Sequence, residues 1–351
     1  MRRADGLVVG VVGATGMVGR ELLALLESRR FPVGELRPFS SGRAKSSVRF
    51  KGRALAAPEV SISALRSCDV VFLVSSDKVA LKLAPTLSAR GVWTIDDSAA
   101  FRLNNDIPLV IPEVNGGALR KDRRLISGPN CTMVGLAVAG AQLHRKIGVR
   151  EVRLASYQAV SGAGKAALAE LFTQYSSLSH LGSKPDGRAP VLRPGKSSVL
   201  PRAIAYNAIP QVGRFGDDGY SSEETKVADE LRKIWSAPRL KVSVTAVRVP
   251  SIRGHALAVW LTLARPITLT RARALLENTP SLVLSRDGDY PTPRSVGGRG
   301  PVYAGRLRQG AVPKELALWI ASDNLLKGAA LNSVQVAEEL RRRGWLTRRS
   351  R

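Results

Sequence analysis

Thiols are scarce in this chain, which has only two cysteines, Cys68 and Cys131, among 351 residues. Two cysteines cannot build a disulfide framework, and such scarcity is typical of proteins in a reducing cytoplasm. Histidine is almost as rare, with three residues, and no histidine or cysteine cluster has the spacing of metal ligands. We therefore expect a cytoplasmic protein without a metal site.

Long apolar runs are missing as well, since none approaches the roughly 20 residues that a membrane-spanning helix needs. The stretch MRRADGLVVGVVG places basic residues before an apolar run, as a signal peptide does. That run is short, however, and it continues into a glycine-rich turn and an amphipathic helix instead of a cleavage site. We expect neither secretion nor a membrane partner.

Acidic residues are too few to balance the bases, because 28 Asp and Glu face 54 Lys and Arg and the net charge is +26. Outside residues 1–5 and 341–351, 46 bases still face 27 acids, so the excess is spread over the body of the chain. Such a charge permits binding to nucleic acid. Arginine outnumbers lysine by 40 to 14. We interpret this as a compositional bias and favour it over selection for a nucleic-acid partner.

The first 130 residues alternate between apolar runs of strand length and helical patterns. The predicted strands are 7–12, 35–41, 69–75 and 92–98, and the predicted helices are 18–29 and 78–91. Continuously apolar strands that alternate with helices predict an α/β fold with a parallel, doubly wound sheet. We therefore predict an N-terminal Rossmann domain over residues 1–130.

Beyond residue 150 the strands are longer and alternate better between apolar and polar residues, which indicates an α+β domain with a mostly antiparallel sheet. We assign this second domain to residues 131–323. The segment 182–198 is rich in Gly, Pro and Ser and predicts an exposed loop. The predicted elements are strands at 152–160, 241–249 and 256–264, and helices at 132–143, 166–178 and 324–344.

A glycine-rich turn follows the first predicted strand, in GVVGATGMVG. Glycines let backbone N–H groups approach a pyrophosphate at the N-terminus of the following helix, which predicts dinucleotide binding. Proteins that prefer NAD carry an acid after the second strand, but here FSSGRAKS has none. Ser41, Arg43 and Lys45 suit a 2′-phosphate, so we predict NADP. The residues expected at the cofactor are Gly13, Thr15, Gly16, Met17, Val18, Ser41 and Arg43.

Cys131 lies in GPNCTM, just before an apolar helical run. A thiol at the N-terminus of a helix has its thiolate stabilised by the helix dipole, which favours a nucleophile. Asn130 can cap that helix, and its amide or the neighbouring N–H groups can hold an oxyanion. By position alone, a buried structural cysteine is an equal alternative for Cys131. We interpret Cys68, at the start of a core strand, as core packing.

Motifs spread in order over nearly the whole chain make it resemble the bacterial aspartate-semialdehyde dehydrogenases. They are GATGMVG, SAAFR, PLVIPEVN, GPNCTM, YQAVSGAG, AIAYNAIPQVGRF, GYSSEETK, VRVPSIRGHA and DNLLKGAALNSVQVAEEL. The resemblance implies NADP-dependent reductive dephosphorylation of L-aspartyl 4-phosphate to aspartate 4-semialdehyde, toward lysine, diaminopimelate, methionine, threonine and isoleucine. It also implies a homodimer and a C-terminal helix, residues 324–345, that returns to the first domain.

The resemblance also implies roles for individual residues. Cys131 would attack the acyl phosphate and form a thioester, with His255 as acid and base, and Gln158 beside the thiol. Histidine suits this role because its charge changes near neutral pH. The implied substrate ligands are Arg248 for the carboxylate, Arg102 for phosphate, Glu223 for the ammonium and Lys226 beside phosphate; Ser161, Gly162 and Asn324 would lie near the nicotinamide. Independently of these roles, Ser221 and Glu224 have the spacing of a helix capping box.

Two segments depart from the family pattern. Residues 75–78 read SSDK where the family often has a Ser-Ala-Gly-Gly type loop, and residues 96–99 read DDSA where it has Asp-Asn-Ser-Ser. Asp77 adds a carboxylate near the expected pyrophosphate, which weakens cofactor binding unless the side chain points away.

Two alternatives stay open at this point. N-acetyl-γ-glutamyl-phosphate reductase performs the same chemistry on a longer acyl phosphate, but QAVSGAG, EETK and RVPSIRGHA favour the aspartyl enzyme. A non-catalytic descendant that binds nucleic acid would explain the charge of +26, and it predicts binding that depends steeply on salt.

Overall fold

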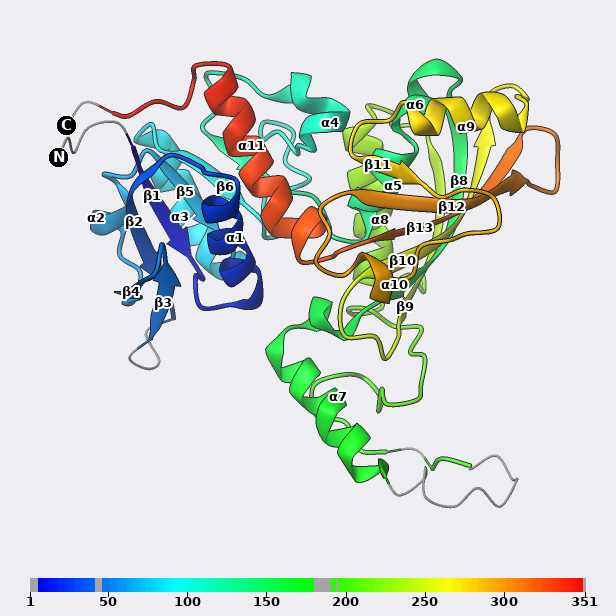
Figure 1. Cartoon of the computed structure of the whole chain (residues 1–351), viewed down its shortest axis with the longest axis horizontal. Coiled ribbons are helices and arrows are strands. Elements are labelled where there is room, and N and C mark those ends of the chain that lie inside the picture. The colour runs from blue at the N-terminus through cyan, green and yellow to red at the C-terminus, as the bar shows by residue number, and fades with distance from the viewer. Residues whose placement is uncertain (1–5, 42–45, 180–190, 194, 350–351) are drawn as a thin grey trace.

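The computed structural model describes residues 6–41, 46–179, 191–193 and 195–349. They form two large sheets and a two-stranded one, and α11 lies between the two large sheets (Figure 1). The first sheet has five parallel strands in the order β2-β1-β5-β6-β7. Its central strands are buried along their whole length, as their unbroken apolar sequences predict. The bounds are β1 Leu7–Val12, β2 Val33–Phe39, β5 Val70–Leu73, β6 Trp93–Asp96 and β7 Leu125–Ser127.

Helices and a hairpin complete this first unit. Leu22, Leu23 and Leu26 of α1 pack on the sheet with β1, which explains their helical spacing. The remaining elements are α1 Met17–Ser28, β3 Ser47–Phe50, β4 Arg53–Ala56, α2 Ile62–Leu65, α3 Asp77–Ala89, α4 Pro112–Asn115 and the 3₁₀ turn η1 Gly116–Ala118.

The second sheet has six strands in the order β11-β12-β13-β10-β8-β9. Three of its pairings are antiparallel, whereas β8 with β9 and β11 with β12 are parallel. The predicted fold class, a Rossmann domain followed by a mostly antiparallel α+β domain, is confirmed. The bounds are β8 Val149–Gln158, β9 Lys241–Arg248, β10 His255–Leu263, β11 Leu282–Leu284, β12 Val302–Gln309 and β13 Glu315–Ser322.

Helices α5, α6, α8 and α9 bury the apolar side chains of one face of this sheet in a single core. The predicted helix over 132–143 is divided in two at Gly140. A Cβ at this position would lie 2.6 Å from the Trp235 ring, so only glycine fits there. The helices are α5 Met133–Ala139, α6 Ala141–Lys146, α8 Ser222–Ile234, α9 Leu269–Glu277 and α10 Pro293–Val296.

The last helix also differs from its prediction, since it opens with a turn of π-helix, η4 (Leu326–Ala330), before α11 (Leu331–Arg342) begins. Val334, Ala337 and Leu340 of α11 join the core of the first sheet beside α1 (Figure 1). The chain therefore returns to its first half after completing the second sheet. We propose residues 1–130 with 324–345 as one domain and 131–323 as the other.

Helix α7 (Lys165–Ser177) stands away from both sheets (Figure 1) and follows the 3₁₀ turn η2 (Val160–Ala163). Leu171 and Ile204 bury one side of it in a small separate core. The described residues of the predicted loop 182–198 form no helix or strand and are mostly exposed. Throughout the described ranges, every helix is too short or too polar to cross a bilayer.

Candidate active site

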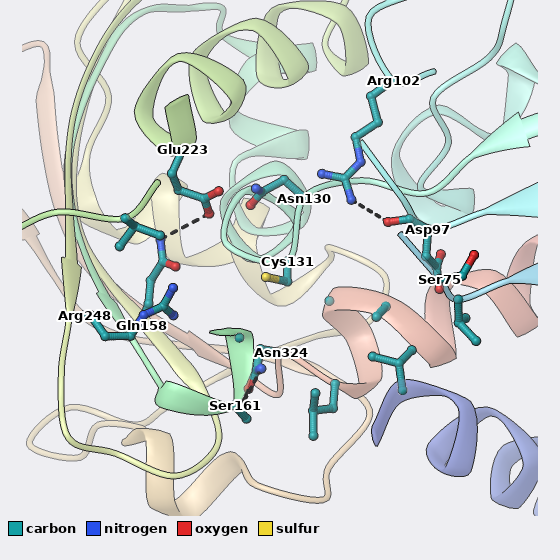
Figure 2. Close-up of a pocket in the computed structure, with 17 residues that line it drawn as sticks. Ser75, Asp97, Arg102, Asn130, Cys131, Gln158, Ser161, Glu223, Arg248 and Asn324 are labelled. Atoms are coloured by element: carbon teal, nitrogen blue, oxygen red, sulfur yellow. Dashed lines mark hydrogen bonds between the residues drawn. The ribbon is translucent and has the colours of Figure 1, made fainter. Parts of the chain in front are cut away.

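A cavity lies between the two sheets, where the carboxyl end of the first sheet faces η4 and the ends of β8 and β9 (Figure 2). Such edges of parallel sheets are usual places for ligands. The structure brings most of the sequence-predicted residues together here. Those that line the cavity are Val18, Arg102, Asn130, Cys131, Gln158, Ser161, Gly162, Glu223, Arg248 and Asn324.

The other predicted residues lie elsewhere. His255 is buried beneath the wall and contacts Cys131. Lys226 is partly buried on α8, one turn beyond Glu223, and does not line the cavity. Arg43, with Lys45, lies outside the residues that the structure describes. Those that belong to the glycine-rich turn or to the end of β2, outside the cavity wall, are Gly13, Thr15, Gly16, Met17 and Ser41.

Cys131 is positioned by the turn between β7 and α5. The side-chain Oδ1 of Asn130 accepts hydrogen bonds from the backbone N–H groups of Thr132, at 2.7 Å, and Met133, at 3.3 Å. Asn130 therefore caps the first turn of α5, as expected. On the other side, Gly328 of η4 packs so closely that an added Cβ would lie 2.7 Å from the Cys131 Cβ. The π-helix thus leaves room for the thiol.

His255, the first residue of β10, places its ring Nε2 3.5 Å from the Sγ of Cys131. Burial raises the pKa of the Cys131 thiol to about 11, helped by Glu223 and opposed by Arg102 and Arg248. This direction is opposite to the one that the helix terminus alone predicts, because desolvation outweighs the dipole. Burial also lowers the pKa of His255 to about 3, with Arg248 adding to the effect.

Arg102 reaches the cavity from the loop after β6 and is held by two acceptors. Its Nη1 pairs with Glu230 Oε1 at 3.1 Å, and its Nη2 donates to the carbonyl of Asp97 at 2.7 Å. Burial lowers the pKa of this guanidinium, but Glu230 outweighs burial and raises it overall. The buried Nε of Arg102 has no partner among the described residues, and the residue itself lines the cavity.

Glu230 is a site residue that the sequence interpretation missed. Its side chain is fully buried, and its Oε2 accepts the backbone N–H of Asn130 at 2.6 Å while its Oε1 holds Arg102. One carboxylate therefore connects the arginine to the turn that carries Cys131. The seven-residue separation from Glu223 puts both acids on one face of α8, and this spacing is a signal that the sequence already contained.

The opposite wall carries Arg248, Gln158 and Glu223. Arg248, at the end of β9, donates from Nη1 to the carbonyl of Ala159 at 2.9 Å, and burial lowers its pKa. Glu223 Oε1 accepts from Gln158 Nε2 at 3.3 Å and from Thr132 Oγ1 at 3.1 Å. The predicted capping box of Ser221 and Glu224 is present and leaves Glu223 free to face the cavity (Figure 2).

The glycine-rich turn has the geometry that a pyrophosphate needs. Gly13 has a φ of 88°, and a Cβ there would meet the carbonyl of Val74 at 2.3 Å. Gly19 lets α1 approach Gly13 equally closely. From the second domain, Lys165 Nζ donates to the carbonyl of Thr15 at 2.8 Å, which places a cation beside the turn.

The wall between this turn and Cys131 contains buried polar atoms without partners among the described residues, namely Ser75 Oγ and Asp97 Oδ2. Ser161 and Asn324 hydrogen-bond each other nearby (Figure 2). The N–H of Gly254 donates to Asn324 Oδ1 at 2.9 Å. Unpaired buried donors and acceptors are costly in a finished core. These residues therefore fit the polar nicotinamide end of a dinucleotide.

The comparisons with known proteins agree with this geometry. The sequence model described as "Semialdehyde dehydrogenase, NAD binding domain" matches residues 8–122, and "Semialdehyde dehydrogenase, dimerisation domain" matches residues 141–327. Aspartate-semialdehyde dehydrogenase of Bacillus subtilis is 38% identical over 343 residues, which cover 96% of this chain and 98% of the relative. The chain belongs to the aspartate-semialdehyde dehydrogenase family.

Solved structures support the same assignment. Aspartate semialdehyde dehydrogenase II from Vibrio cholerae superposes with a TM-score of 0.90 at 36% identity, covering 96% of this chain and 99% of that one. A structure of that enzyme complexed with ASA gives a TM-score of 0.90 at 35% identity, covering 97% and 99%. The chain therefore has an N-terminal Rossmann-type, NAD-binding domain and a C-terminal domain with a mostly antiparallel sheet.

Proposed function

We propose that this protein catalyses the NADP-dependent interconversion of L-aspartyl 4-phosphate and L-aspartate 4-semialdehyde through a thioester on Cys131. The observation that carries the proposal is the placement of this thiol in one cavity with Arg102 and Arg248, with the His255 ring 3.5 Å from its sulfur. The family and the ASA complex of the Vibrio cholerae enzyme support the substrate. The comparisons do not favour the alternative reaction, that of N-acetyl-γ-glutamyl-phosphate reductase.

Opposite charges on the two walls orient the substrate. Arg248 presents a guanidinium that can pair with the α-carboxylate in a bidentate manner, and Glu223 offers a carboxylate to the ammonium group. Arg102, with its unpartnered Nε, takes the phosphate on the other side of Cys131. This arrangement leaves the acyl carbon between the two arginines, beside the sulfur. Lys226 would assist only by longer-range attraction, because it lies outside the cavity wall.

The chemistry at Cys131 begins when its sulfur adds to the acyl carbon and the bond from carbon to phosphate breaks. The side-chain NH₂ group of Asn130, next to Cys131 on the cavity wall, would donate a hydrogen bond to the developing oxyanion. Gln158, bonded to Glu223, closes the opposite side. The product of this step is a thioester on Cys131 and free phosphate, which Arg102 releases.

The dinucleotide would lie along the turn Gly13–Val18, with Ser161, Gly162 and Asn324 at its nicotinamide end. When bound, NADPH supplies the hydride that reduces the thioester. We infer NADP in preference to NAD because β2 is followed by Ser41 and by Arg43, and by no acid. Arg43 is outside the described residues, so a direct comparison of the two cofactors in binding is the decisive measurement.

We further propose a homodimer in the cytoplasm. The match to a semialdehyde dehydrogenase dimerisation domain over residues 141–327 supports the dimer. The cytoplasmic location remains a prediction from the cysteine content. Sedimentation of the purified protein across a range of concentrations tests the oligomer directly.

The proposed reaction is tested by supplying purified protein with aspartate semialdehyde, NADP and phosphate, and following the formation of NADPH. We expect turnover that requires phosphate and disappears in Cys131→Ala. Cys68→Ala is the matched control, since Cys68 is a buried core residue in the first domain and should leave turnover unchanged. Turnover that persists in Cys131→Ala, or that does not need phosphate, would contradict the thioester route.

A further inference from the structure

A buried lysine lies on η4, one residue before the glycine that packs against Cys131. The side chain of Lys327 is fully buried, and its Nζ donates to Oε1 and Oε2 of Glu113 at 2.8 and 2.7 Å and to Oε1 of Gln335 at 2.7 Å. Burial lowers the pKa of this ammonium group, and the Glu113 carboxylate opposes that effect. An ammonium group has three protons, so the described residues supply one acceptor for each of them.

Glu113 connects η4 to elements of both sheets. It belongs to α4, and its Oε1 also accepts from Gln335 Nε2 on α11, at 2.8 Å, and from Oγ of Ser281, just before β11, at 2.7 Å. Burial raises the pKa of the Glu113 carboxyl, but the ion pair with Lys327 and the bonds from its neighbours outweigh burial and lower it overall. The pair therefore ties η4 to α4, to α11 and to the start of β11.

The start of η4 is fixed as well. Asp323 Oδ1 accepts the backbone N–H groups of Leu325, at 2.8 Å, and Leu326, at 3.1 Å. Its carbonyl accepts the N–H of Gly328 at 3.1 Å, across the five residues that are typical of a π-helix. Such turns are rare, and they are frequent at functional sites. Contacts at its start and along its side thus hold this uncommon turn.

We propose that Lys327 and Glu113 are positioning residues: their ion pair holds η4 in place, and η4 sets the position of the Cys131 sulfur in the cavity. This inference rests on the proposed function. Neither residue of the pair lines the cavity, so their influence reaches the thiol through the backbone of η4. Gly328 does line it, and a Cβ on this residue would lie 2.7 Å from the Cys131 Cβ. A small movement of η4 therefore either displaces the thiol or uncovers it.

The stability of the fold alone does not call for an ion pair at this place. Apolar side chains of similar size often stabilise a core as well as a buried ion pair does. A fully satisfied polar network adds direction, because it favours one arrangement of its donors and acceptors over the others. The three bonds of Lys327 Nζ lead to α4 and to α11, so they fix η4 relative to both helices.

Lys327→Met tests the proposal, because methionine keeps the apolar stem and removes the ammonium group. With aspartate semialdehyde, NADP and phosphate as substrates, we expect kcat to fall about tenfold to a hundredfold, the usual cost of misplacing a reacting group by about 1 Å. The KM for phosphate should stay within about twofold, because Arg102 is held by Glu230 and Asp97 and not by η4.

Arg29→Met is the matched control. Arg29 forms a partly exposed ion pair with Glu338 of α11, so this variant removes a cation that also contacts the last helix but lies far out on the surface. Such pairs contribute little, and we expect kcat and the KM for phosphate to match those of wild type.

Alkylation by iodoacetamide, followed by mass spectrometry, gives a readout that does not depend on turnover. Gly328 covers Cys131, so release of η4 in Lys327→Met should raise the alkylation rate of Cys131 about threefold or more. Cys68 is buried in the core of the first domain and reports global unfolding in the same sample. If Lys327 had only a structural role, the rates of both cysteines would rise together or neither would rise.

Glu113→Gln is the second variant, in case Lys327→Met does not fold. Its NH₂ group would face a donor, so kcat should fall about threefold to tenfold, and Cys131 should again gain reactivity without Cys68. The proposal is overturned if the folded variants keep kcat within about twofold of wild type, or if both cysteines gain reactivity equally. If wild type shows no turnover while the alkylation of Cys131 still rises selectively, the proposed function fails and the control of the thiol by η4 stands.

Discussion

Replacement of Glu230 by glutamine should be far more damaging than its small change in shape suggests. Both partners of this buried carboxylate are donors, namely Arg102 Nη1 at 3.1 Å and the Asn130 N–H at 2.6 Å. A carboxylate offers an acceptor to each. Glutamine has one acceptor, so its NH₂ group must face one of the two donors, whichever way the amide is turned.

The expected cost follows from these two contacts. A buried donor left without an acceptor costs about 1–3 kcal/mol. Removal of one partner from a buried ion pair costs about 3–5 kcal/mol, because the other charge stays behind without compensation. We therefore expect Glu230→Gln to lower the free energy of unfolding by about 3 kcal/mol. Because Arg102 loses its orienting partner, the KM for phosphate should rise about tenfold or more, the equivalent of about 1.4 kcal/mol.

The assay compares Glu230→Gln with Asp229→Asn, which makes the same chemical change at the preceding position. Asp229 pairs with Arg232 on the partly exposed face of α8, so its loss should cost under about 1 kcal/mol. Thermal unfolding and the KM values for phosphate and for aspartate semialdehyde are measured on both. The reasoning is wrong if the two variants unfold alike and keep the same KM for phosphate. If Glu230 had only a structural role, Glu230→Gln would lower the stability, but it would not raise the KM for phosphate more than the KM for aspartate semialdehyde.

Three further predictions concern the neighbours of the cavity. Lys165→Met should weaken NADP binding about threefold to tenfold, because it removes the cation whose Nζ lies 2.8 Å from the Thr15 carbonyl oxygen. Calorimetry measures the affinity, and the control variant Lys146→Met on α6 should bind NADP as wild type does. Gly328→Ala should lower kcat about tenfold or more with little effect on NADP affinity, because the new Cβ displaces Cys131. An unchanged kcat would show that η4 moves to accommodate the methyl group. Between about pH 3 and pH 6.5 the free energy of unfolding of the wild type should rise with pH, relative to that of His255→Gln, by about 1.4 kcal/mol per pH unit. The reason is that the unfolded chain binds a proton at His255 in this range, whereas the folded chain does not. Parallel unfolding curves of the two proteins over this range would refute that expectation.

Local patterns were enough to predict four of the five strands of the first sheet, because parallel strands buried on both faces read as unbroken apolar runs. The short strand β7 (Leu125–Ser127) was not predicted. Local patterns also predicted the Asn130 cap and the capping box at Ser221. The close packing of Trp235 on Gly140 was not predictable in this way, because the two residues lie nearly a hundred positions apart in the sequence. Glu230 was missed for the same reason: its partners, Arg102 and Asn130, come from other parts of the chain.

The direction of the Cys131 pKa shift shows a second limit of sequence reasoning. A helix terminus is a local feature and favours the thiolate, but burial depends on the whole fold. Here burial by η4 and the cavity walls outweighs the local effect. Among the charged groups around the thiol, Arg102 and Arg248 are the two that oppose this effect and lower its pKa.

The two departures from the family pattern prove to be connected. Asp77, the first residue of α3, accepts the backbone N–H of Ala99 at 2.9 Å, so the added carboxylate of one segment bonds to the backbone of the other. Asp77 does not line the cavity, and its charge lies at a helix N-terminus, where an anion is stabilised. The expected penalty for a pyrophosphate is thereby reduced.

Asp97 is the departure that does face the cavity. Its Oδ1 bonds Ser333, its Oδ2 has no partner among the described residues, and burial raises its pKa to about 6. A carboxyl with such a pKa is mostly ionised at neutral pH and then only accepts hydrogen bonds, whereas below about pH 6 it is mostly protonated and can also donate one. The substitution of Asp for the Asn of the family pattern therefore keeps the acceptor on this wall and makes the donor dependent on pH.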